Sequence, residues 1–363
     1  MKIAIVGFRF CCSTGKRNRQ VWEEYAKLYK TEEIHIYTGK KYLWDKWKED
    51  LDPNPFKNLK IHQIPIWFSK LGQFKYAFPT IIPELLKLKP DRVYVAEEPT
   101  QPFVTWLCAL YCKFKKTPFY FFTYENQNKR WFFPVNHFEK LCLRIAKKII
   151  CASEKSAKIL TQKFRLPSKK IHIFPETGID LNVFKKTKPL RLRKKIILFT
   201  GRFIPEKGIK DIIKAKKRLD SQGEKYSWLF IGSGQMREYI QSEGGKNIKI
   251  YPWVQRKKLA EQYNKAKVFL YPSLQTESWE EQFGYSMVES LACGTPVITT
   301  PNAGALGIVK DKTSFVPFGN PKVLASKIRR FVKMKKEINC NADVRKRFSL
   351  NSIAKKWHSV FFN

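Results

Sequence analysis

Two glutamates, Glu281 and Glu289, stand eight positions apart in the stretch EEQFGYSMVESLACGTPVITT. A helix is expected to begin near Gly284, which places Glu281 in the preceding loop and Glu289 inside the helix. Carboxylates accept paired hydrogen bonds from sugar hydroxyls, and the backbone N–H groups of Phe283, Gly284 and Tyr285 suit a diphosphate or a sugar oxygen. The alternative is that Glu281 only complements the helix dipole while Glu289 faces water.

Two cations occur in a second stretch, ILFTGRFIPEKGIKDIIKA, where Arg202 and Lys207 lie between Gly201 and Gly208. An apolar run precedes them and a helical pattern follows. Glycine allows a close approach of the backbone, and the start of a helix attracts anions. The pattern predicts a phosphate cradle. The alternative is that both residues are ordinary surface cations.

Short apolar runs alternate with helical patterns along the whole chain, which favours an α/β fold with parallel sheets covered on both faces. The predicted strands lie near 2–8, 32–39, 58–66, 91–99, 117–126, 146–153, 171–178, 196–201, 226–234, 247–254, 268–273, 295–300 and 314–319. The economical interpretation is two doubly wound, Rossmann-like domains in tandem. Ligands bind such sheets at the carboxyl ends of the strands.

The domain boundaries are expected at a basic segment. Residues 1–182 form the first predicted domain, and 183–195, with seven basic residues and no acid, form the predicted linker. Residues 196–345 form the second domain. The amphipathic pattern of 346–363 predicts a helix that crosses back to the first domain.

The charge is strongly positive, since 70 Lys and Arg against 31 Asp and Glu give +39 over 363 residues. Such a field favours anionic partners, including a membrane surface or phosphorylated substrates. A general preference for surface lysine explains the composition equally well. No nucleic-acid-binding module is recognisable, so no specific nucleic-acid partner is expected.

The longest apolar run, FVTWLCALYCKF over 103–114, is too short to span a membrane and predicts a buried helix. The first residues, MKIAIVGF, predict the first strand of a cytosolic protein. The eight cysteines show no metal-binding spacing, so reduced core thiols are expected and structural zinc is not.

Four segments carry a resemblance. In this order and spacing, GRFIPEKG, FIGSGQMRE, VFLYPS and EEQFGYSMVESLACGTPVI resemble the nucleotide-sugar domain of family 4 glycosyltransferases, closely over 196–300 and more loosely elsewhere. The resemblance implies the GT-B architecture, in which two Rossmann-like domains face each other across a cleft. It also implies a retaining reaction on a nucleotide-diphosphate sugar.

The resemblance implies roles for single residues. Arg202 and Lys207 would hold the donor diphosphate and stabilise the charge of the leaving group, so no metal or other cofactor is expected. Glu281 would contact the transferred sugar and act in catalysis, and Glu289 would bind the ribose hydroxyls. Gly15, in the first βα loop, would let that loop approach the donor and the acceptor.

The chain departs from the family pattern at two places. Tyr124, Glu125 and Asn126 stand where many relatives have a His-Asp pair, and these three are assigned to the acceptor side. Gly307 replaces an acid that relatives often carry before an Ile-Val pair.

The leading hypothesis is a glycosyltransferase that moves a hexose to a glycan or lipid-linked acceptor, acting at the cytoplasmic face of the membrane. The alternative is a catalytically degenerate GT-B scaffold that binds an anionic membrane or partners in glycan assembly. Turnover of any nucleotide sugar separates the two.

Overall fold

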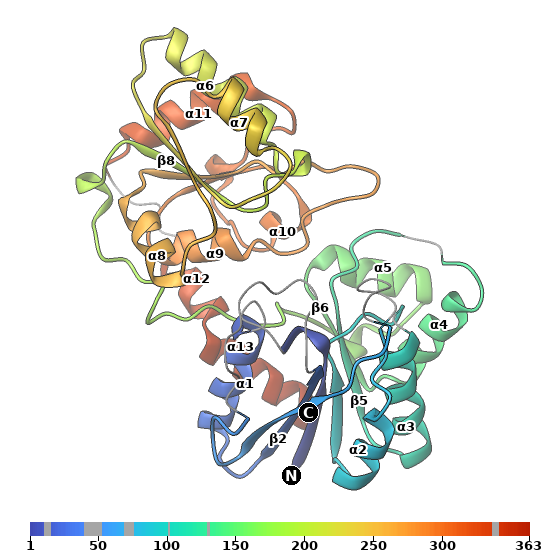
Figure 1. Ribbon diagram of the computed structural model, residues 1–363. Coiled ribbons are helices and arrows are strands. Elements are labelled where there is room, and N and C mark those ends of the chain that lie inside the picture. Colours follow the sequence, from blue (N-terminus) through green and yellow to red (C-terminus); the bar gives the residue numbers. More distant parts are fainter. Residues whose placement is uncertain (11–15, 40–52, 69–75, 101, 129–130, 336–340) are drawn as a thin grey trace. The chain divides into compact units, whose positions relative to one another are not determined.

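The computed structural model describes residues 1–10, 16–39, 53–68, 76–100, 102–128, 131–335 and 341–363 (Figure 1). The chain divides into two compact units. Unit 1 holds Met1–Gly178 and Leu350–Asn363, and unit 2 holds Ile179–Ser349. Gly15, which was expected to line the donor site, lies outside the described residues.

Unit 1 contains a seven-stranded parallel sheet in the order β3-β2-β1-β4-β5-β6-β7. Its strands are β1 (Lys2–Val6), β2 (Glu33–Gly39), β3 (Leu59–Ile64), β4 (Arg92–Val95), β5 (Phe119–Thr123), β6 (Lys148–Cys151) and β7 (Ile171–Ile173). In β1, Ile3 and Ile5 enter one core, while Ala4 and Val6 enter the other, because successive side chains of a strand point to opposite faces. Both faces of this sheet are therefore buried.

Helices cover both faces of this sheet (Figure 1). They are η1 (Phe8–Phe10), α1 (Lys16–Leu28), α2 (Ile81–Leu88), η3 (Pro102–Trp106), α3 (Leu107–Lys115), α4 (Val135–Ile145), α5 (Glu154–Phe164), η4 (Ser168–Lys170) and α13 (Leu350–Phe362). α2 to α5 share one core, and α1 shares the other with α13. The last helix of the chain thus packs in the first unit, where Trp357 is fully buried beside Trp22.

Unit 2 contains a five-stranded parallel sheet in the order β10-β9-β8-β11-β12. Its strands are β8 (Ile196–Thr200), β9 (Ser227–Ile231), β10 (Ile248–Tyr251), β11 (Val268–Tyr271) and β12 (Val297–Thr299). Its helices are η5 (Leu190–Leu192), η6 (Pro205–Lys207), α6 (Ile209–Ser221), α7 (Arg237–Glu243), α8 (Arg256–Lys265), α9 (Tyr285–Ala292), α10 (Ala303–Leu306), η7 (Lys312–Ser314), α11 (Pro321–Lys333) and α12 (Asn341–Phe348). α6, α7 and α11 share one core, and α8, α9 and α12 the other. The predicted α/β class with two Rossmann-like domains is confirmed.

The basic segment 183–195 does not form a linker. It belongs to unit 2, where Phe184 and Leu190 are buried. Arg193 is buried too, and its guanidinium donates hydrogen bonds to the carbonyl oxygens of Cys293 (2.7 Å) and Tyr263 (3.2 Å). A buried cation is tolerated when its donors are satisfied, so this run is part of the second fold.

Two predicted elements differ from the structure. Residues 314–319 form no named strand, and only Phe315 makes a single bridge with Thr299. The run 103–114, predicted as a buried helix, is helical but leaves Phe114 79% exposed.

Five cysteines lie in the described residues, and all five are free and buried: Cys108, Cys112, Cys142, Cys151 and Cys293. Burial raises the pKa of the Cys293 thiol to about 12, which keeps it protonated. None of the helices in the described ranges is both long and apolar enough to cross a bilayer.

The packing of α13 predicts that Trp357→Ala strongly destabilises unit 1. The indole ring lies 4.4 Å from the Tyr94 ring, and its Nε1 donates to the Glu176 carbonyl oxygen at 3.0 Å. Loss of such a buried ring costs about 3–5 kcal/mol. Urea denaturation followed by circular dichroism measures this, with Lys355→Ala, an exposed change on the same helix, as the control. A cost below about 1 kcal/mol would contradict the packing.

Candidate active site

The sheet of unit 2 changes direction between β8 and β11. From β8 the chain proceeds outward through β9 to β10, and it then returns to start β11 on the other side of β8. Loops that leave neighbouring parallel strands at such a switch point diverge, and ligands bind in the crevice at the carboxyl ends of the strands. The loops after β8 and β11 carry the predicted cations and Glu281.

Gly208 fixes the loop that follows β8. Its φ is +70°, in the left-handed region, and a Cβ at this position would lie 2.1 Å from the carbonyl oxygen of Pro272. Only glycine fits this close approach between the two loops. The turn ends η6 and places Lys207, which is 7% exposed, beneath the loop after β11.

Lys207 and Glu281 form a buried ion pair across these two loops. The Lys207 ammonium also donates to the Tyr271 hydroxyl at 3.0 Å and lies 5.3 Å from the centre of the Trp279 ring. The Ser273 hydroxyl donates to Glu281 Oε2 at 3.4 Å. Burial, and then the neighbouring Glu281 carboxylate, raises the pKa of Tyr271 well above its usual range, so this phenol stays protonated.

Backbone contacts hold the loop that carries Glu281. The Gly304 N–H donates to the Glu281 carbonyl oxygen at 3.0 Å, and the Ala303 N–H donates to the Glu280 carboxylate at 2.9 Å. The Leu274 N–H donates to the Glu206 carbonyl oxygen at 2.7 Å, which ties the loop after β11 to the loop after β8. Hydrogen bonds therefore join the two loops to each other and the Glu281 loop to the start of α10.

Glu289 lies in α9 and is buried, so the alternative that it faces water is wrong. The Tyr263 hydroxyl donates to Glu289 Oε2 at 3.4 Å and lies 3.0 Å from the Thr200 hydroxyl. Burial and the Glu289 carboxylate raise the pKa of Tyr263 well above its usual range. Because Thr200 ends β8, Glu289 lies at the same edge of the sheet as the ion pair.

Arg202 is exposed, unlike Lys207. It follows β8 in a loop that the Phe203 N–H fastens to the Ser233 carbonyl oxygen at 2.7 Å. α9 begins at Tyr285, directly after its N-cap residue Gly284, which has no side chain to cap the helix. The structure thus brings the predicted donor residues of unit 2 to one edge of one sheet.

The predicted acceptor-side residues lie in unit 1, after β5. The Tyr124 hydroxyl donates to Glu176 Oε2 at 3.2 Å, and its N–H donates to Glu98 Oε1 at 2.7 Å. Asn126 is buried, and Glu125 accepts a hydrogen bond from the Gln127 N–H at 3.0 Å. Tyr124 therefore holds other parts of unit 1 in place.

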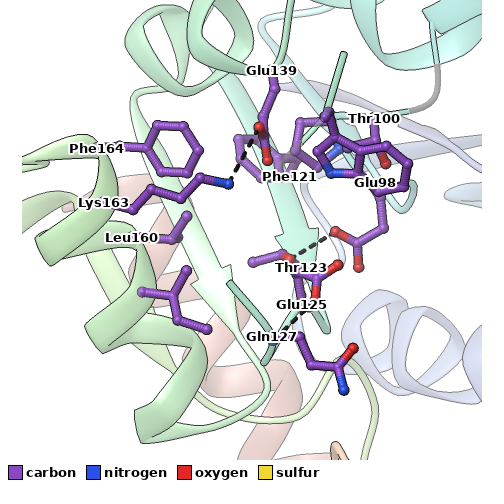
Figure 2. Close-up of a pocket in the computed structure, with 13 residues that line it drawn as sticks. Glu98, Thr100, Phe121, Thr123, Glu125, Gln127, Glu139, Leu160, Lys163 and Phe164 are labelled. Atoms are coloured by element: carbon purple, nitrogen blue, oxygen red, sulfur yellow. Dashed lines mark hydrogen bonds and ion pairs between the residues drawn. The ribbon is translucent and has the colours of Figure 1, made fainter. Parts of the chain in front are cut away.

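Glu125 also lines a small pocket within unit 1, shown in Figure 2. Two further glutamates, Glu98 and Glu139, line it with Lys163, whose ammonium lies 3.8 Å from Glu139. Burial raises the pKa of Glu139. Glu98 accepts from the Thr123 hydroxyl at 2.7 Å, so this carboxylate also serves to fix the end of β5.

Several residues of the site were not found from the sequence: Thr200, Tyr263, Tyr271, Ser273, Trp279 and Glu280. Tyr271 and Thr200 each end a buried strand, and a hydroxyl at such a position was a usable signal. No such signal marks Trp279, because its contact with Lys207 joins residues that are far apart in the sequence.

A reaction without metal stays a prediction. Within the ranges that the structure describes, no group of three or more His, Cys, Asp or Glu side chains is placed to hold a metal ion. The sequence does contain one Asp-x-Asp, Asp50-Leu51-Asp52, which lies outside those ranges.

Family models match most of the chain. The model described as "Glycosyl transferases group 1" matches residues 182–353, and the one described as "Glycosyltransferase Family 4" matches 41–183. A glycosyltransferase from Methanocaldococcus jannaschii, named uncharacterized, is 29% identical over 191 residues, 49% of this chain and 47% of that protein. The capsular polysaccharide biosynthesis glycosyltransferase CapM of Staphylococcus aureus is 31% identical over 143 residues, 38% of this chain and 36% of CapM. The matches thus span less than half the length of either relative.

Solved structures share the fold. A sucrose-phosphate synthase from Thermosynechococcus elongatus aligns with a TM-score of 0.69 at 18% identity, covering 99% of this chain and 98% of that one. The Anabaena protein HepE, in complex with UDP and glucose, aligns with a TM-score of 0.68 at 16% identity, covering 99% of both chains.

Two glycines with similar φ values test the close approach of the loops that follow β8 and β11. Gly208 (+70°) abuts the Pro272 carbonyl, whereas Gly223 (+76°) has open space around its Cβ position. Gly223→Ala should cost about 1–2 kcal/mol from backbone conformation alone. Gly208→Ala should cost a further ~1–3 kcal/mol because neighbouring backbone must move. Chemical denaturation measures both, and equal costs would show that the close approach does not exist.

Proposed function

Because the chain belongs to the group 1, family 4 glycosyltransferases, we propose that it transfers a hexose from a nucleotide-diphosphate sugar to a glycan or lipid-linked acceptor, with retention of configuration. One observation carries the proposal. The buried Lys207–Glu281 pair lies at the carboxyl edge of the unit 2 sheet, with the exposed Arg202 and the start of α9 at the same edge.

The proposed chemistry follows from charge. Breaking the bond between sugar and diphosphate leaves negative charge on the leaving phosphate, and preorganised donors stabilise that charge. Arg202, Lys207 and the amides at Phe283, Gly284 and Tyr285 are the proposed donors. No step of this scheme uses a metal.

The two glutamates take separate proposed roles. Glu281 is oriented by Lys207 and Ser273 and would accept hydrogen bonds from hydroxyls of the transferred sugar. Glu289 is oriented by the Tyr263 hydroxyl and would accept hydrogen bonds from the ribose. An oriented carboxylate loses less side-chain freedom on binding, which favours both roles.

The names of similar proteins support the choice of substrates. HepE was solved with UDP and with UDP-glucose, so a uridine diphosphate sugar is the first donor to test. CapM and AmsK of Erwinia amylovora are named for capsular polysaccharide and amylovoran biosynthesis, which supports a glycan acceptor. The net charge of +39 supports work at an anionic membrane surface, on its cytoplasmic side.

The second candidate, a degenerate scaffold, rests on Tyr124, Glu125 and Asn126. Tyr124 makes structural hydrogen bonds in unit 1, so a catalytic role at this position is not evident. The scaffold would bind no donor productively. Measured transfer or hydrolysis of any nucleotide sugar removes this candidate.

The test begins with a thermal-shift panel of uridine, guanosine and adenosine diphosphate sugars, since a ligand at a hundred times its Kd stabilises the folded state by about 2.7 kcal/mol. The donor found is then used to compare Arg202→Ala with wild type. Arg202 is exposed, so we expect an unchanged denaturation midpoint and a loss of turnover on the order of a hundredfold.

Arg191→Ala removes the same charge from another exposed position of unit 2 and should retain full turnover. Equal turnover in wild type and both variants would remove Arg202 from the proposed mechanism. Equal losses in both would mean that overall charge, rather than this loop, supports the reaction.

The Lys207–Glu281 pair predicts a non-additive result. Lys207→Met or Glu281→Gln alone alters one member of a buried pair, and loss of one partner costs about 3–5 kcal/mol where the other charge remains. The double variant should cost clearly less than the sum of the singles, while donor turnover is lost in all three. A double-mutant cycle by urea denaturation measures the coupling. Strict additivity would contradict the ion pair.

A further inference from the structure

α3 presents large apolar side chains to solvent. Phe103 in η3, Leu107 and Phe114 are 48%, 37% and 79% exposed, and they lie on the helix that the sequence predicted to be buried. Soluble proteins rarely expose contiguous apolar patches unless these bind something. We propose that this face of unit 1 inserts into the surface of an anionic membrane. The proposal rests on the proposed function and deepens it, because it names where a membrane-bound acceptor system would be met.

The sequence spacing of Phe103, Leu107 and Phe114 places them on one face. Leu107 and Phe114 are seven positions apart, about two turns of an α-helix, so they lie one above the other. Phe103 precedes Leu107 by one turn of the π-helical η3. The opposite side of α3 carries Cys108, Ala109 and Cys112, which are buried in the core of unit 1. α3 thus packs on unit 1 by this buried side, whereas Leu107 and Phe114 lie on its solvent-facing side.

Two more aromatic side chains extend this face. The Phe68 ring centre lies 6.4 Å from that of Phe103, and the Trp67 ring centre lies 6.3 Å from that of Phe68. Both are more than half exposed. We call Trp67, Phe68, Phe103, Leu107 and Phe114 the aromatic face. Tryptophan and phenylalanine are the side chains that interfacial segments place at the headgroup boundary.

The charge beside the aromatic face selects the partner. Lys113, Lys115 and Lys116 are exposed at the end of α3, and residues 102–116 contain no Asp or Glu. Lysine is depleted in protein–protein interfaces, whereas it accompanies apolar side chains on surfaces that bind anionic lipid. An anionic bilayer matches both the apolar side chains and the neighbouring lysines. A second copy of this basic chain would instead bring like charges together.

The experiment is co-sedimentation of the full chain with vesicles of phosphatidylcholine alone and of equal parts phosphatidylcholine and phosphatidylglycerol, at physiological salt. We expect binding only to the anionic vesicles. Phe103→Ser with Phe114→Ser should weaken it by at least tenfold, and so should changing Lys113, Lys115 and Lys116 to Gln. Circular dichroism and the donor thermal shift check that each variant is folded and that the donor site, which lies in unit 2, is intact.

Matched controls lie in unit 2. Leu306→Ser removes an apolar side chain that is 61% exposed, and Lys214, Lys257 and Lys258 changed to Gln remove the same charge as the lysine variant. Both controls should bind vesicles as wild type does. Loss of binding in the lysine control equal to that in the α3 variant would overturn the proposal in favour of overall charge.

Two other results would also overturn it. In the first, the wild-type chain binds no anionic vesicle but the donor still raises its thermal stability. The proposed function then stands and the membrane proposal does not. In the second, the wild-type chain binds no vesicles but self-associates with rising concentration in sedimentation velocity, and the two serine changes abolish that self-association. The aromatic face would then be an interface between copies of the chain. If instead no nucleotide sugar raises the thermal stability while vesicle binding is intact, the result would count against the proposed transferase activity and not against the membrane proposal.

Discussion

The buried ion pair of Lys207 and Glu281 is the interaction on which the candidate site depends. Both residues are buried, and a lone charge at that depth is strongly unfavourable, so each requires the other. The pair joins a loop after β8 to a loop after β11, across the point where the sheet changes direction. Gly208 makes the approach of these loops possible, and the ring of Trp279 covers the ammonium. The loops are therefore fixed in place by the protein's own contacts.

The charges of the candidate site are of two kinds, those that form the Lys207–Glu281 pair and those that lie outside it. The ion pair is neutral as a unit, so it orients groups without adding net charge. Outside the pair, positive charge comes from Arg202, which is exposed, and from the partial charge at the start of α9, while Glu289 contributes a buried carboxylate. A large overall charge attracts any anion, and salt screens it. Discrimination for a diphosphate that carries a sugar requires donors in fixed positions, and the proposed donors lie together at one edge of the unit 2 sheet.

The fold and much of the site could be predicted from the sequence, because strand, glycine and helix follow one another in a regular order in both halves. Arg202, Lys207, Glu281 and Glu289 were found since they flank such turns. The burial of the segment around Arg193 could not be predicted, because seven basic residues resemble a solvated linker until their hydrogen-bond partners are known. The exposed side of α3 was missed for a different reason. Periodicity reveals a surface only when that surface is polar, and an apolar one makes the helix look buried all round.

The departure at Tyr124 has a structural explanation that leaves the chemistry of unit 2 untouched. Its hydroxyl bonds to Glu176, a fully buried residue whose carbonyl oxygen accepts the Trp357 indole N–H. Tyr124 thus belongs to the contacts that hold α13 on unit 1. A residue engaged in this way contributes to stability whether or not the chain is active. The unusual sequence at this position is therefore weak support for a degenerate scaffold, whereas the charged residues that follow β8 and β11 are the ones on which the proposed chemistry depends.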